Sequence, residues 1–111
     1  MPWKVEQVLA HAFVREPRRL LREYQFFVGE IPVAITIRLY ELIGSKQIEF
    51  DQSHFIRTPD QIAPDTTIVR AWDSEGDALE AAISPFVEDY GAAVAEGYKP
   101  RESWLVRNED F

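Results

Sequence analysis

Few residues in this chain have side chains suited to catalysis, and His54 is the first of them to consider. The chain has two histidines and no cysteine. Histidine titrates near neutral pH, so it can serve as an acid, a base or a metal ligand. His11 falls near the polar edge of a predicted helix and is expected to be a solvated surface residue. His54 is therefore the leading candidate for chemistry.

His54 lies in a predicted strand, two residues after Gln52 and six before Asp60. Alternate residues of a strand share one face, so Gln52 and His54 should both point toward the core. Two interpretations stay open. His54 is either structural, bonded to Gln52 or to loop carbonyls near Thr58, or it lines a small catalytic or ligand-binding pocket with Gln52 and Asp60. Ser53 should point to the opposite face, which argues against a Ser–His nucleophilic pair.

The motifs of common cofactor and metal sites are missing. The sequence has no phosphate-binding loop, no glycine pattern for dinucleotides, no zinc-protease motif and no nucleophile elbow. Without cysteine it cannot form disulfides, thiolate nucleophiles or iron–sulfur clusters. The acidic run 73–77 has its glycine too early for a calcium loop. We expect no cofactor and assign no metal site.

Basic residues gather near the N-terminus, at Arg15, Arg18, Arg19 and Arg22. Glutamates are interleaved with them, so the cluster is either a solvated stretch or a contact for an anion or an acidic partner. The acidic half of a second copy of the chain is one such partner. Among the three tryptophans, Trp3 is expected to be exposed and so to be available as an interface anchor. These five residues are the candidate binding residues.

Charge is distributed unevenly along the chain. The net charge is −7. Residues 1–57 carry eight basic and seven acidic residues, and residues 58–111 carry four basic and twelve acidic. Affinity for nucleic acids and for anionic membranes depends on neutralising phosphates, so we expect neither partner. The acidic half serves solubility, meets a basic partner or imitates a nucleic acid.

The first part of the chain predicts one helix followed by strands. Apolar residues at helical spacing predict an amphipathic helix over 3–14, which Pro17 ends. Gly44 and Ser45 predict a two-residue hairpin loop with glycine first. That loop would place Arg38 opposite Asp51 on neighbouring strands. The stretches that favour strands are 24–28, 33–43, 46–57, 67–72 and 103–106.

A long amphipathic helix is predicted over 75–96. Its apolar stripe keeps the same phase on both sides of Pro85, so we expect one kinked helix rather than two. Gly97 and Pro100 mark its end. The stripe consists of Leu79, Ile83, Phe86, Tyr90 and Val94.

These elements predict a single α+β domain over residues 1–111. We expect an antiparallel sheet of three or four strands, with the long kinked helix packed on one face and the N-terminal helix alongside. The N-terminus lacks the pattern of an export signal and no apolar run could span a bilayer, so a cytoplasmic location is expected.

The function predicted from these features is that of a small acidic accessory or regulatory protein. It would act without catalysis, by binding another protein, with a homo-oligomer as one form of that binding. The alternatives are a ligand-binding protein or enzyme with a pocket around Gln52 and His54, and an acidic mimic of nucleic acid.

Overall fold

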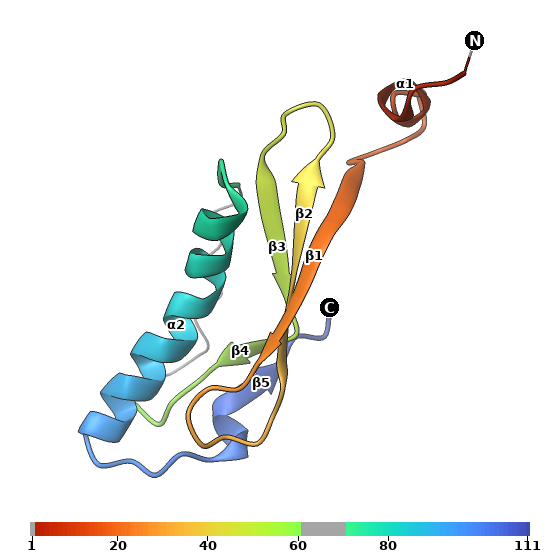
Figure 1. The fold of residues 1–111 in the computed structure, drawn as a ribbon. Coiled ribbons are helices and arrows are strands. Elements are labelled where there is room, and N and C mark those ends of the chain that lie inside the picture. Colours follow the sequence, from red (N-terminus) through yellow and green to blue (C-terminus); the bar gives the residue numbers. More distant parts are fainter. Residues whose placement is uncertain (1, 61–70) are drawn as a thin grey trace.

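The structure is a computed structural model that describes residues 2–60 and 71–111. It contains a three-stranded antiparallel sheet and a second sheet of two short strands, with one long helix packed on them (Figure 1). A short helix precedes the first strand. The predicted α+β class is therefore confirmed. The elements are α1 (Val5–Leu9), β1 (Arg18–Phe26), β2 (Ile35–Leu42), β3 (Ile48–Gln52), β4 (His54–Ile56), α2 (Glu75–Ala95), the 3-10 turn η1 (Glu102–Trp104) and β5 (Leu105–Arg107).

The larger sheet has the strand order β1-β2-β3, and the predicted register between β2 and β3 is confirmed. Arg38 pairs with Asp51 across the two strands. The loop that joins them is longer than predicted, because Leu42 and Gln47 are the residues that bond across its base, at 2.8 Å. The backbone N–H of Ile43 bonds Pro17 instead of continuing the hairpin. The loop still contains an even number of residues, so the register is unchanged.

The smaller sheet pairs β4 with β5, and His54 lies opposite Arg107. The last predicted strand is thus present, displaced by one residue at its end. The predicted strand over 67–72 lies outside the described residues except for its last two positions. Of these, Trp72 forms a bridge with Ile48 through two backbone hydrogen bonds of 2.8 Å.

Helix α2 runs without interruption through Pro85, as the continuous apolar phase predicted. The side chain of Ser74 caps its first turn by accepting a hydrogen bond from the Asp77 N–H, at 3.1 Å. The buried stripe is rotated relative to the prediction, and Val94 is exposed. The fully buried residues of α2 are Ala78, Ala82, Phe86 and Ala93. Three of these four residues are alanines, whose small side chains permit a close approach of α2 to the sheet.

The core lies between α2 and the inner face of β2 and β3. The buried β2 residues are Ile35, Ile37 and Leu39, and Phe86 of α2 packs edge-on against Phe26 at a ring separation of 5.7 Å. Outside this core, Arg18 of β1 reaches across the outer face of the sheet. It bonds Glu49 at 2.7 Å and Asp51 at 3.1 Å. The three strands are therefore tied together on both faces.

Helix α1 is shorter than predicted, and none of its residues is buried. The predicted position alongside the long helix is wrong: α1 stands beyond the end of the sheet and away from α2 (Figure 1). The backbone turns sharply between α1 and β1, where Glu16 has a φ of 50°. The molecule is consequently elongated, with extents of 64 × 24 × 22 Å.

Candidate functional site

The structure does not bring Gln52, His54 and Asp60 together into one pocket. Gln52 ends β3 and His54 begins β4, and the chain bends at Ser53 between them. The bend interrupts the alternation of a single strand, so the two side chains point into different cavities. The Gln52 amide donates to the His54 backbone carbonyl at 2.8 Å. Asp60 accepts a hydrogen bond from the Thr58 hydroxyl.

The ring of His54 contacts Ser53, which was predicted to lie on the opposite face of the strand. Ser53 Oγ lies 2.7 Å from His54 Nδ1, so the expectation of separate faces is wrong. Ser53 Oγ also accepts the backbone N–H of Thr36 at 2.8 Å, which leaves its own proton to be donated to the ring. Burial, and secondarily the positive charge of Arg107, lower the pKa of His54. A neutral ring with Nδ1 as the acceptor fits both observations.

His54 lines a small cavity of about 330 Å³ on the outer side of the sheet. Arg107 contributes the positive charge of this cavity and Glu109 the negative charge. Asn108 is already bonded: its amide donates to the Gln52 carbonyl at 2.8 Å and its oxygen accepts from Asp110 at 3.0 Å. The remaining groups could orient a small polar ligand. The complete lining is Ala34, Thr36, Ser53, His54, Arg107, Asn108, Glu109 and Phe111.

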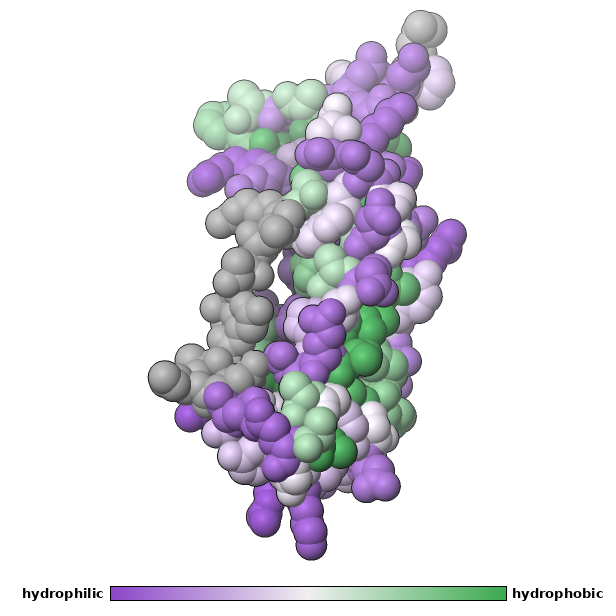
Figure 2. All heavy atoms as spheres, turned by 90° about the vertical axis from the view of Figure 1, so that its left-hand side faces the viewer, coloured by the Kyte–Doolittle hydropathy of each residue, from purple (hydrophilic) through white to green (hydrophobic). Residues whose placement is uncertain are grey.

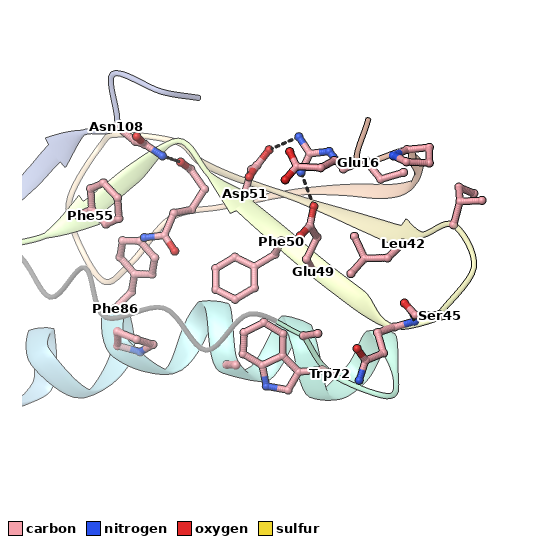
Figure 3. Close-up of a pocket in the computed structure, with 18 of the residues that line it drawn as sticks. Glu16, Leu42, Ser45, Glu49, Phe50, Asp51, Phe55, Trp72, Phe86 and Asn108 are labelled. Atoms are coloured by element: carbon pink, nitrogen blue, oxygen red, sulfur yellow. Dashed lines mark hydrogen bonds and ion pairs between the residues drawn. The ribbon is translucent and has the colours of Figure 1, made fainter. Parts of the chain in front are cut away.

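A larger cavity of about 920 Å³ lies along β3 and α2 (Figure 3). Its apolar wall includes Phe50 and Trp72, whose rings are 5.1 Å apart. Its polar residues are largely bonded within the chain. Glu49 and Asp51 form ion pairs with Arg18, and the Gln52 amide donates a hydrogen bond to the His54 carbonyl. Ligand sites combine apolar walls with a few convergent free polar groups, and most of the described polar groups of this cavity are already bonded within the chain.

Three of the four arginines predicted to bind a partner have acidic partners within the chain. Arg18 bonds both Glu49 and Asp51, with its guanidinium 3.7 Å from the centre of the Tyr40 ring. The ion pairs of the other two are Arg19 to Glu41 at 2.7 Å and Arg22 to Glu75 at 3.2 Å. Arg15 is exposed and precedes this network. These ion pairs therefore join the strands to one another and β1 to α2, and Arg15 is the cation of the cluster best placed for an external contact.

The residues before β1 form an exposed apolar segment, which we call the N-terminal arm (residues 2–15). Trp3 belongs to it and is 71 % exposed, with its ring 5.9 Å from that of His11. Five large apolar side chains of the arm have exposures from 41 % to 99 %. They are Trp3, Val5, Val8, Phe13 and Val14. Sequence reasoning identified the tryptophan but assigned the valines to a packed helix, because apolar periodicity alone does not reveal what a helix packs against.

A second exposed apolar feature lies on α2. Val87 is 57 % exposed and Val94 is 42 % exposed, and they are seven residues apart on one side of the helix. Figure 2 views the molecule from the α2 side and shows hydrophobic side chains gathered along one flank. The chain from 71 to 98 contains no Lys or Arg, so all the charged side chains that α2 itself carries are acidic.

Residues 2–60 and 71–111 show neither a candidate metal site nor a candidate membrane span. No group of three or more histidine or carboxylate residues in these ranges could hold a metal ion. No helix in the same ranges is long and apolar enough to cross a membrane. Comparison of the chain with protein-family models, with curated proteins and with solved structures found no match.

Proposed function

We propose that this protein is a non-enzymatic protein-binding domain that presents its N-terminal arm to a partner. The observation that carries the proposal is the exposure of five large apolar side chains on one short segment. Contiguous exposed apolar surface is uncommon on proteins that act alone, and aromatic side chains such as Trp3 and Phe13 are frequent anchors of interfaces. The arm also contributes no buried residue from α1 to the core.

Photo-cross-linking in cells of the native organism tests this function. A photoreactive phenylalanine analogue at Phe13 should form a defined adduct with a protein partner. The same analogue at Leu20 is the matched control, because Leu20 is 52 % exposed but lies on the sheet. A defined adduct from position 13 alone supports the proposed function. Equal yields from both positions would overturn it.

A second candidate function, binding of a small anionic ligand, depends on the cavity around His54. Arg107 lies opposite His54 in the register of β4 and β5 and lines the same cavity. A guanidinium beside an imidazole suits a carboxylate or a phosphate. Titration with acetate and with inorganic phosphate, followed by NMR of the His54 ring, tests this candidate. Saturable shifts that Arg107→Ala abolishes would support it, whereas shifts that persist in that variant would overturn it.

A further inference from the structure

Gly91 lies between the two exposed valines of α2, on a side of the helix that is exposed in the described structure. A Cβ added at this glycine would meet none of the described residues within 4 Å. Glycine costs a helix about 1 kcal/mol relative to alanine, and no close contact with the described residues requires a glycine here. Val87, Gly91 and Val94 are spaced by four and three residues, so they share one side of the helix. We call this gap between two valines the α2 notch.

The N-terminal arm carries an exposed aromatic side chain that could fill the notch. Phe13 is 99 % exposed, the highest exposure among the large apolar side chains of the described residues. An aromatic ring is the kind of group that fills a gap between two aliphatic side chains over a glycine. The arm also carries Arg15 two residues later, and every charged residue of α2 is acidic.

We propose that the occupant of the α2 notch is the N-terminal arm of a second copy of this chain. This inference depends on the proposed function and names its partner. Phe13 of one copy packs over Gly91 of the other, between Val87 and Val94, and Arg15 lies near the acidic residues of α2. Charge complementarity favours this pairing, because no Lys or Arg of α2 opposes the approach of a cation.

Each chain carries one arm and one notch, so two copies can exchange arms reciprocally. A reciprocal exchange closes a two-fold dimer in which the same contact is made twice. The arm cannot make this contact within its own chain as it stands, because α1 lies beyond the end of the sheet and away from α2 (Figure 1).

Sedimentation velocity of the full-length chain over a range of concentrations tests the dimer. Phe13→Ser removes the arm side of the contact, and Gly91→Leu fills the notch from a position where an added Cβ meets none of the described residues within 4 Å. Each substitution should raise the dimer dissociation constant about tenfold or more. Leu20→Ser, an exposed apolar position outside both features, should leave it unchanged. Circular dichroism and an unfolding curve establish that each variant is folded.

A mixture of the two variants distinguishes arm-to-notch contact from other dimers. The Gly91→Leu chain keeps a normal arm and the Phe13→Ser chain keeps a normal notch, so the mixture can form one of the two contacts. We expect the mixture to associate more tightly than either variant alone. A monomeric wild-type chain, or a mixture with no gain, would overturn the inference. If wild type is monomeric but position 13 cross-links a different protein, the proposed function stands and this occupant is wrong.

Discussion

The lowered pKa of His54 ties one side chain to the stability of the whole fold. Because the folded chain disfavours the protonated ring, the unfolded chain binds the proton first as the pH falls. The contribution of neutral His54 is therefore present above its ordinary pKa of 6.5 and is lost as the pH decreases below that value. The free energy of unfolding should decline through this window.

Chemical denaturation from pH 7.5 to pH 5 checks this prediction. His54→Gln should remove part of the decline, since glutamine does not titrate. His11→Gln, a matched change at an exposed histidine, should decline as the wild type does. An identical pH dependence of wild type and His54→Gln would contradict the assignment of the lowered pKa to this ring.

Gly29 occupies a position where the fold leaves no room for a side chain. Its φ is +51°, and an added Cβ would overlap the ring of Tyr90. The Tyr90 hydroxyl accepts the Glu30 N–H at 3.2 Å, so the ring cannot withdraw without losing that bond. Gly29→Ala should destabilise the chain by about 2–4 kcal/mol through backbone strain and overpacking together.

Gly44→Ala supplies the comparison in the same denaturation experiment. Gly44 also has a positive φ, but no described atom lies within 4 Å of an added Cβ. Its replacement should cost only the backbone strain, about 1 kcal/mol. Equal losses at the two positions would show that the Tyr90 contact is unimportant.

At the scale of elements, the phase of α2 is tested by two adjacent residues. Phe86 is 1 % exposed and lies in the centre of the core, whereas Val87 faces solvent. Phe86→Ala should cost about 3–5 kcal/mol. Val87→Ala should change the free energy of unfolding by less than about 0.5 kcal/mol when measured on dilute, monomeric protein. Similar losses for both would mean that the helix is rotated about its axis.

Arg18 should contribute more to the sheet than its neighbour Arg19. It bonds carboxylates of β3 while its guanidinium lies against Tyr40 of β2, so one side chain connects three strands. Arg18→Ala should cost about 1–2 kcal/mol, the range for a network of charged hydrogen bonds at a surface. Arg19 makes one ion pair and is more exposed, so Arg19→Ala should cost less than about 0.5 kcal/mol. Urea unfolding curves of both variants make the comparison.

The register of the hairpin could be predicted from sequence, whereas the surroundings of His54 could not. Register depends on the alternation of apolar residues in β2 and β3 and on the even number of residues in the loop, and both are local. The contact of His54 with Ser53 depends on a bend that lets β4 leave the sheet and pair with β5, more than fifty residues later. A single strand pattern carries no sign of that change of sheet.

The position of α1 was missed for a similar reason. Apolar spacing over 3–14 predicts that one side of a helix is buried, but it does not say against what. Within one copy, the arm is exposed and α2 retains an open notch. If the buried side of the arm lies in a second copy, the sequence pattern and the exposed arm are consistent, because the periodicity then reports a contact between chains.

At the scale of the whole molecule, overall shape distinguishes an extended N-terminal arm from an arm folded back onto its own α2. The Cα radius of gyration is 17.0 Å. A compact domain of this length would have a radius of about 13 Å. The difference comes from the arm and from the long, narrow sheet, so a chain whose arm folded back onto α2 would be measurably smaller.

Small-angle X-ray scattering of Phe13→Ser, extrapolated to zero concentration, measures this shape in a chain that should not pair. We expect a radius of gyration near the value of the structure, because Phe13 makes no buried contact that directs the arm. The wild-type radius and forward scattering should both rise with concentration as arms are exchanged.

Raising the salt from about 0.1 M to about 1 M shortens the Debye length from about 10 Å to about 3 Å, so the charged part of the contact should weaken while its apolar part persists. A monomer radius near the compact value would show that the arm packs on its own chain, and the notch would then be filled within one copy.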